Sequence, residues 1–151
     1  IIEKINILND ELINIYKIKK PKIYISGLNP HSGDGGKIGK EELTIINPAI
    51  KKLEKLGLDV KGPFPGDTLF QKNKIKEYDV AVCMYHDQAL IPIKTLYSGN
   101  IINTTLGLDF IRTSPDHGTA LDIAGKNKAD PNSLILAIKK AEDLIHKKYV
   151  K

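Results

Sequence analysis

The chain has 151 residues, of which 41% are hydrophobic, and no apolar run is long enough to span a bilayer. Its formal net charge of +5 comes from lysines scattered among acidic residues, which indicates a solvated surface and argues against a nucleic-acid-binding face. The single cysteine, Cys83, excludes an internal disulfide and favours a small buried thiol in a reducing compartment. We therefore expect residues 1–151 to form a single domain, or a fragment of one, in a cytoplasmic protein, with neither a membrane nor a nucleic acid as partner.

Helices and strands alternate along the first half of the chain. Apolar residues recur at three- and four-residue steps over residues 2–15, which predicts a helix, and the short run "KIYISG" predicts a strand. A second helical pattern covers residues 40–56 and ends at Gly57. The segment "LDVKGPFPGD" then predicts a short strand that is interrupted by prolines.

The second half continues this alternation. The run "DVAVCM", residues 79–84, predicts a compact strand that is buried on both faces, as parallel strands are. "NIINTTLG" and "DFIRTS" predict two more extended segments, and residues 130–149 carry an amphipathic helical pattern. This order of elements predicts a layered α/β fold and leaves the order of the strands open.

Two histidines directly follow predicted strands. His31 lies in the glycine-rich stretch "GLNPHSGDGG", and His86 lies in "MYHDQ". Ligands of open α/β sheets gather beyond the carboxyl ends of the strands, which is where both imidazoles are expected. The two residues are 55 positions apart, so the fold and not a local motif must assemble any shared metal site. Taken singly, each histidine is equally well explained as an ordinary turn residue.

Three residues that suit a phosphate group follow one another at nine-residue intervals; we call them the phosphate series. They are Lys94, Asn103 and Arg112, and Arg112 is the only arginine among 23 basic residues. Nine residues are about one strand and a turn, so neighbouring segments can present the three side chains at one rim. An ammonium, an amide and a guanidinium together suit a phosphate monoester. Coincidence among many lysines explains the spacing equally well, and the uniqueness of Arg112 favours the phosphate interpretation.

The segment "DHGTALDIAGKNKADP", residues 116–131, resembles the nucleotide-binding loop of the metal-dependent isocitrate and isopropylmalate dehydrogenases. In that loop the backbone and a histidine hold the adenosine end of the dinucleotide. The resemblance implies that NAD or NADP contacts His117, Gly118, Thr119, Ala120 and Asp130. Asp130 stands where those relatives carry an asparagine that reads adenine, and a carboxylate cannot donate the hydrogen bond that an amide gives.

Five motifs in the expected order carry a wider resemblance. They are "GLNPHSGDGG", "GPFPGDTLF", "MYHDQALIPIK", "INTTLGLDFIRTS" and "DHGTA". Together they resemble the carboxyl-terminal half of the 4-hydroxythreonine-4-phosphate dehydrogenase family, whose fold is the layered α/β/α type of isocitrate and isopropylmalate dehydrogenases. Members of that family are about twice as long, so we expect this chain to represent the carboxyl-terminal part of a longer dehydrogenase.

The resemblance implies a metal site next to a substrate site. The metal-binding histidines of the family map onto His31 and His86, and a third histidine ligand lies upstream of the matched region. The substrate-binding residues of the family map onto the phosphate series. Asp67 and Asp87 match acidic positions of the pocket and are the expected catalytic residues; Asp87 either orients a ligand or binds the cation itself.

The implied reaction is an oxidation that depends on NAD or NADP and on a divalent cation: zinc, magnesium, manganese or cobalt. The substrate would be 4-phosphooxy-L-threonine, and the product, 2-amino-3-oxo-4-(phosphooxy)butanoate, would decarboxylate to 3-amino-2-oxopropyl phosphate in pyridoxal phosphate (vitamin B6) biosynthesis. The resemblance also implies a homodimer with its active site at the subunit interface. We expect the chain to be inactive without the amino-terminal half that such dehydrogenases carry.

Two alternatives remain open at this point. The chain is also compatible with a related dehydrogenase for another phosphorylated hydroxy acid, such as threonate or erythronate phosphate, because residues that grip phosphate do not identify the rest of a substrate. A non-catalytic module that binds an acidic ligand or nucleic acid is the third interpretation, motivated by the positive net charge.

Overall fold

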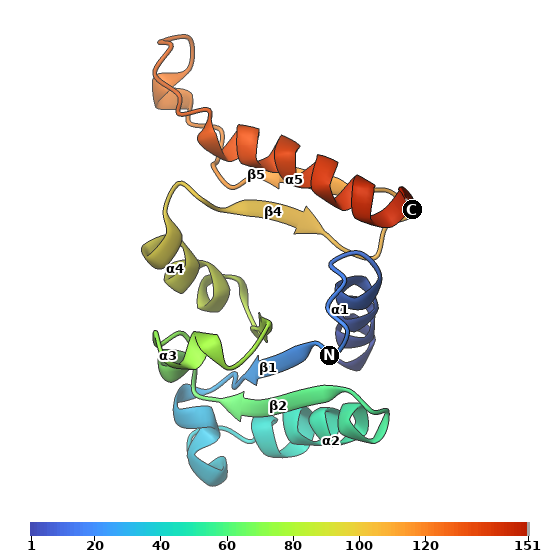
Figure 1. Cartoon of the computed structure of the whole chain (residues 1–151). Coiled ribbons are helices and arrows are strands. Elements are labelled where there is room, and N and C mark those ends of the chain that lie inside the picture. The colour runs from blue at the N-terminus through green and yellow to red at the C-terminus, as the bar shows by residue number, and fades with distance from the viewer. Residues whose placement is uncertain (151) are drawn as a thin grey trace.

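A computed structural model describes residues 1–150, and within them the strands form two small sheets (Figure 1). The first sheet is parallel in the order β2-β1-β3 and consists of β1 (Lys22–Ser26), β2 (Asp59–Phe64) and β3 (Val80–Val82). The second is an antiparallel ribbon of β4 (Ile102–Thr105) and β5 (Arg112–Pro115). The α/β class expected from the sequence is confirmed.

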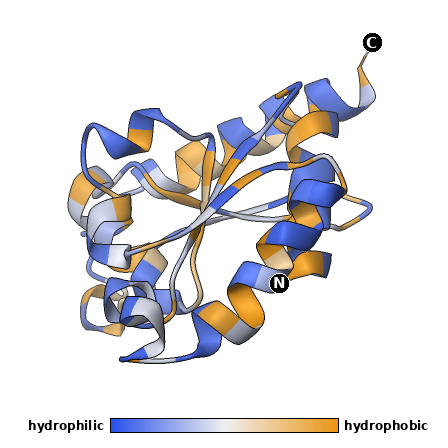
Figure 2. Cartoon of the chain, turned by 90° about the horizontal axis from the view of Figure 1, so that it is seen from below, coloured by the Kyte–Doolittle hydropathy of each residue, from blue (hydrophilic) through white to orange (hydrophobic). Residues whose placement is uncertain are grey.

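Helices α1 (Ile2–Asn14) and α2 (Asn47–Lys55) pack with the parallel sheet, as Figure 1 shows for α2 beside β2. Figure 2 shows hydrophobic residues recurring along α1, the helix at the N-terminus. The core that they build is almost entirely aliphatic: Ile5, Ile23, Ile25, Ile46, Ile50, Leu53 and Val60. Burying aliphatic side chains from both layers is the main favourable contribution to folding here, because it removes their apolar surface from water.

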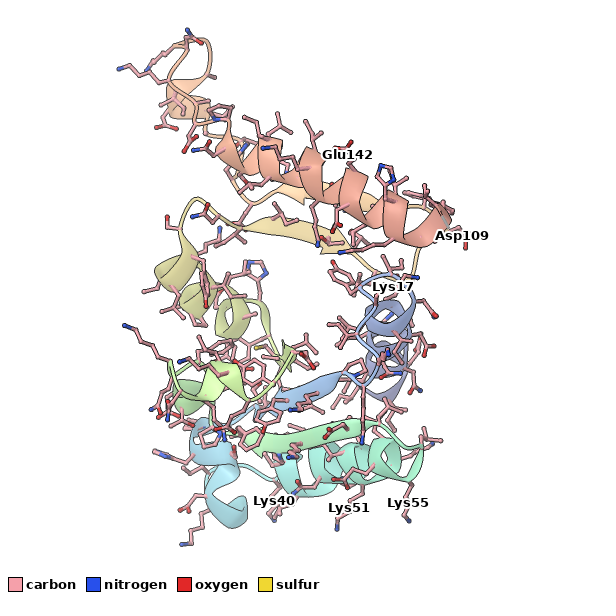
Figure 3. All side chains as sticks on the ribbon, in the orientation of Figure 1. Lys17, Lys40, Lys51, Lys55, Asp109 and Glu142 are labelled. Atoms are coloured by element: carbon pink, nitrogen blue, oxygen red, sulfur yellow. The ribbon has the colours of Figure 1, made fainter. Side chains whose placement is uncertain are left out.

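The expected helix over residues 40–56 is divided in two. A π-helical turn, η2 (Glu42–Ile46), precedes α2, and Pro48 lies in the first turn of α2. Proline has no N–H to donate, so a regular α-helical hydrogen-bond ladder cannot run through this position. Lys51 and Lys55 project from α2 away from the sheet, with Lys40 on the same side (Figure 3), in agreement with a solvated lysine surface.

Helix α5 (Asn132–Tyr149) covers one face of the ribbon, with Ala137 and Leu144 buried against it. The Thr113 hydroxyl donates a hydrogen bond to the carbonyl oxygen of Ala137 at 2.8 Å, which fixes this face of β5 toward the helix. Successive side chains alternate across a strand, so Arg112 on β5 points to the opposite face. The register pairs Arg112 with Thr105 and Asn103 with Ser114, and therefore places Asn103 and Arg112 on that same face.

Two features differ from the expectations for residues 79–97. Strand β3 was expected to be buried on both faces, but it is an edge strand whose residues are only half-buried, because it pairs with β1 alone within residues 1–150. The segment after it forms α4 (His86–Tyr97), which the sequence patterns did not predict. The apolar stretch of α4 has no clear helical period, and Pro92 lies inside the helix.

Shorter turns complete the chain. They are the short helix α3 (Gly66–Leu69) and the 3-10 segments η1 (Pro30–Gly36), η3 (Lys74–Lys76) and η4 (Leu121–Ile123). Within residues 1–150, no helix is both long enough and apolar enough for a membrane crossing.

Candidate functional site

The stretch that carries His31, residues 27–36, leaves the carboxyl end of β1 in an unusual conformation; we call it the histidine loop. His31, Ser32 and Asp34 have φ angles of 53°, 52° and 44°, and the glycines among and after them are also left-handed. A residue with a Cβ costs about 1–2 kcal/mol in this region, so several such residues in a row require support from the surrounding structure.

Glu42 provides much of that support. Its side chain is 2% exposed, and its Oε1 accepts hydrogen bonds from the N–H groups of Leu28 at 2.8 Å and Asn29 at 2.7 Å. Its Oε2 accepts another from the Asn29 side-chain amide at 2.9 Å. Burial by itself raises the pKa of Glu42, but the hydrogen bonds from Asn29 and from the backbone outweigh it, so the pKa lies below its ordinary value. The charged carboxylate therefore anchors the start of the histidine loop.

The glycine at position 33 is required by this arrangement. Gly33 has a φ of +82°, and a Cβ built on it would lie 2.7 Å from Glu42 Oε2 and 2.8 Å from the carbonyl oxygen of Gly39. Any larger residue would displace the carboxylate that holds the loop. Gly27 also approaches Glu42, since a Cβ built on it would lie 3.1 Å from Oε1, so two glycines of the loop allow its close contact with this carboxylate.

A cavity of about 680 Å³, the first cavity, opens beside the histidine loop. His31, Asp67 and Asp87 line it, and they come from the loop, from the start of α3 and from the start of α4. His86 is the first residue of α4 and the neighbour of Asp87, but it is exposed and is not among the lining residues. The tertiary structure therefore brings the expected catalytic carboxylates and one expected metal ligand to one place, whereas the second expected ligand, His86, is not among the lining residues.

The donors fit a divalent cation only in part. Imidazole and carboxylate groups are the ligands that zinc and similar cations take. Within residues 1–150, however, no group of three or more His, Cys, Asp and Glu side chains is arranged to hold a metal ion. A complete coordination sphere at this place would need donors beyond those that the described part of the chain brings together.

A second cavity of about 640 Å³ is lined by Lys94 and by residues of the 116–131 loop. It includes all five residues expected to contact the dinucleotide: His117, Gly118, Thr119, Ala120 and Asp130. Helix α4 carries Asp87 in its first turn and Lys94 in its last turn, so one helix borders both cavities.

Two charged groups of the second cavity already have partners. Lys94 Nζ lies 3.2 Å from Asp116 Oδ2, in an ion pair that sequence reasoning missed although Asp116 directly precedes His117. Asp130 Oδ1 accepts a hydrogen bond from the N–H of Asn132 at 3.0 Å, at the first residue of α5. The carboxylate of Asp130 thus stabilises the start of α5 by accepting the hydrogen bond of a backbone N–H that has no partner within the helix.

The phosphate series is not gathered in one cavity. Lys94 lines the second cavity, whereas Arg112 borders a small hollow between the ribbon, α1 and α5 and donates a hydrogen bond from Nη1 to Thr105 Oγ1 at 2.7 Å. Asn103 shares a ribbon face with Arg112 and lines none of these three cavities. A joint phosphate clamp by the three residues remains a prediction.

Cys83 was expected to be buried, but the structure shows it only half-buried. Burial raises the pKa of its thiol, and a hydrogen bond with Ser26 only partly opposes this effect.

Comparison with known proteins gives a consistent result. The family model for the pyridoxal phosphate biosynthetic protein PdxA matches residues 1–141. A 4-hydroxythreonine-4-phosphate dehydrogenase of Bradyrhizobium diazoefficiens is 55% identical over 141 residues, which are 93% of this chain and 41% of that protein. A crystal structure of the dehydrogenase of the same name from Klebsiella pneumoniae superimposes with a TM-score of 0.83 at 42% identity, over 95% of this chain and 43% of that one.

A more distant solved structure is a terephthalate 1,2-cis-dihydrodiol dehydrogenase from Burkholderia xenovorans, with a TM-score of 0.66 and 34% identity over 88% of this chain and 42% of that one. The chain thus spans less than half the length of the relatives it matches. Because the family model covers nearly the whole sequence, this chain belongs to the PdxA family of pyridoxal phosphate biosynthetic proteins.

Proposed function

We propose that the protein takes part in pyridoxal phosphate biosynthesis as a dehydrogenase that oxidises 4-phosphooxy-L-threonine with NAD or NADP. The observation that carries this proposal is the meeting of His31, Asp67 and Asp87 at one cavity, next to a second cavity lined by the expected dinucleotide loop. The names of the relatives support the same reaction. The expected product, a β-keto acid, would lose carbon dioxide to give 3-amino-2-oxopropyl phosphate.

The residues of the first cavity suit the chemistry at the hydroxyl carbon. Oxidation of a secondary alcohol transfers a hydride to the nicotinamide and releases the hydroxyl proton. Asp67 and Asp87 are the carboxylates available to accept that proton. His31 and His86 would hold a divalent cation, which when bound supplies stabilisation of negative charge on the substrate oxygen. In this proposal the histidine loop and the start of α4 orient the alcohol between carboxylates and imidazoles.

The residues of the second cavity suit binding and positioning. His117 and the backbone of residues 118–120 would contact the adenosine end of the dinucleotide. Lys94 would leave or share its ion pair with Asp116 to hold the substrate phosphate, with Asn103 and Arg112 approaching from the ribbon. Phosphate contacts remote from the reacting carbon contribute binding energy that positions the alcohol against the nicotinamide.

We also infer that activity requires donors from outside residues 1–150, since the described residues do not complete a metal site by themselves. A further polypeptide segment or a second subunit can supply these donors. A homodimer with a shared active site satisfies this requirement, and its measured mass in solution would test it.

A second candidate is oxidation of a different substrate at the same site. The likeness to a terephthalate dihydrodiol dehydrogenase favours it, because the substrate named for that protein is a diol without a phosphate group. Threonate and erythronate phosphates are further possibilities that the phosphate series does not distinguish. The grip of Lys94 on a phosphate group is the feature that separates phosphorylated substrates from the diol.

The deciding experiment uses the protein together with the further segment or subunit inferred above, and compares 4-phosphooxy-L-threonine, phosphorylated threonate and erythronate, and a cis-dihydrodiol as substrates, with NAD and NADP and each divalent cation. We expect reduced dinucleotide only with 4-phosphooxy-L-threonine. Metal binding by calorimetry in His86→Ala, with His146→Ala on α5 as matched control, tests the cation separately. Turnover of another substrate alone, or unchanged metal affinity in His86→Ala, would overturn the corresponding part of the proposal.

A further inference from the structure

The side-chain amide of Gln88, the third residue of α4, joins three segments of the chain. Its Oε1 accepts hydrogen bonds from the Ser26 hydroxyl at 2.5 Å and from the N–H of Met84 at 2.8 Å. Its Nε2 donates a hydrogen bond to the carbonyl oxygen of Gly27 at 2.8 Å. One planar group therefore connects the end of β1, the first residue of the histidine loop and the turn from β3 into α4.

A fourth segment packs against the same amide. A Cβ built on Gly66 would lie 3.0 Å from Gln88 Nε2, so the start of α3, which carries Asp67, is in direct contact with it. Gln88 is also one of the lining residues of the first cavity. All the segments that bring His31, Asp67 and Asp87 to this cavity thus meet at one side chain.

The contacts require an amide and not merely a polar group. The oxygen must accept from two donors while the nitrogen donates to a carbonyl, and a carboxylate would place a second oxygen against Gly27. Ser26 is fully buried, and its hydroxyl donates to Gln88 Oε1, so loss of the amide would leave this hydroxyl only the weaker hydrogen bond with the Cys83 thiol. The histidine loop has a second anchor in Glu42, but Gln88 alone links it to α4 among the hydrogen bonds described for residues 1–150.

We infer that Gln88 is a positioning residue: it fixes the histidine loop relative to the start of α4, and so sets His31 and His86 relative to each other. This inference rests on the proposed function only for the role of the two imidazoles as cation ligands. The fixed arrangement itself follows from the hydrogen bonds of Gln88. Removal of a residue that orients metal ligands without binding the metal itself typically weakens metal affinity about 10–100-fold.

The first test is metal-independent and follows the ring signals of the four histidines by NMR at constant pH. In Gln88→Met, which keeps the length of the side chain without its hydrogen bonds, we expect the signals of both His31 and His86 to move. Those of His117 and His146 should stay in place. The matched control is Gln71→Met, which should leave all four signals unchanged, since Gln71 lines the same cavity but its side chain makes no hydrogen bond with residues 1–150.

A second variant separates the two halves of the amide and protects the test against a failure of Gln88→Met to fold. Gln88→Glu keeps an acceptor for Ser26 and Met84 but loses the donor to Gly27. We expect it to move the backbone N–H signals of the histidine loop while the N–H signal of Met84 stays near its wild-type position. The ring signals do not serve for this variant, because the new carboxylate charge acts on both imidazoles directly. Unchanged His31 and His86 ring signals in Gln88→Met together with unchanged loop N–H signals in Gln88→Glu, or equal shifts in Gln71→Met, would overturn the inference.

Titration with Zn²⁺ or Co²⁺ gives the functional readout. We expect Gln88→Met to weaken binding about 10–100-fold relative to the wild type. If the wild type binds neither cation even together with the further segment or subunit that supplies the missing donors, the proposed metal role is refuted, whereas the NMR comparison still decides the positioning role of Gln88. Full wild-type affinity in a folded Gln88→Met variant would overturn the link between positioning and metal binding.

Discussion

Replacement of Glu42 by alanine should destabilise the protein far more than a typical surface change. The carboxylate is 2% exposed and accepts hydrogen bonds from two backbone N–H groups, those of Leu28 and Asn29, and from the Asn29 side chain. Hydrogen bonds to a charged group contribute about 1.5–3 kcal/mol each. Since bonds to one group are not additive, the two stranded backbone donors set the expected loss at about 3–5 kcal/mol in the free energy of unfolding.

Urea denaturation followed by circular dichroism measures this loss, with an unchanged slope showing that the unfolded state is comparable. Glu42→Gln keeps one oxygen for the backbone donors and should lose about 1–2 kcal/mol. Glu41→Gln is the matched control, because Glu41 is less buried than Glu42 and its hydrogen bond to the histidine loop comes from the Asn29 side chain, so its transition should lie closest to that of the wild type. A Glu42→Ala protein within about 1 kcal/mol of the wild type would refute the anchoring role.

The lowered pKa of Glu42 also predicts how the stability of the protein changes in acid. Its pKa in the folded protein lies below the ordinary value of 4.5, so the folded state binds fewer protons than the unfolded state in that range. Its contribution to stability is therefore complete above pH 4.5 and is lost as the pH falls toward the lowered pKa. The stability of Glu42→Gln should fall less steeply with acid than that of the wild type, and parallel curves would contradict this.

Three further predictions concern separate parts of the molecule. Lys94→Met should weaken binding of the phosphorylated substrate about 10–100-fold, as measured by calorimetry. Lys128→Met, in the same cavity, should have a smaller effect. An equal loss of substrate affinity in both variants would indicate only a general attraction between charges. Cys83 should react slowly with a thiol reagent at neutral pH and quickly after unfolding in urea, because burial raises its pKa; fast reaction in the folded state would contradict its environment. The hydrogen bond to Glu77 raises the pKa of Lys74 above 10.5. This pair therefore stabilises the fold below pH 10.5, and its contribution is lost as the pH rises through the raised pKa. Lys74→Met should flatten the alkaline part of the curve of stability against pH, and an unchanged curve would refute this role of the pair.

Local sequence pattern was sufficient for the elements with a clear helical period. Apolar residues recur at helical spacing over residues 2–15 and 130–149, and the structure has α1 and α5 there, each with two buried apolar residues. The pattern failed for α4, because its apolar residues show no helical period and none of them is fully buried within residues 1–150. It also failed to place β3 at an edge, since burial on both faces depends on neighbours that a short apolar run does not specify.

The sequence by itself determined which chemical groups this protein has and that His31 and His86 follow strands, because motifs and periodicity are local properties of a chain. Only the tertiary structure decided that β1 and β3 are neighbours, that Asp67 and Asp87 share a cavity with His31, and that the phosphate series is spread over separate places. The groups that hold the site together, Glu42 and Gln88, act on the histidine loop across 13 to 14 and 61 positions of the chain. Hydrogen bonds over such distances depend on how whole elements pack, and no local pattern specifies that packing.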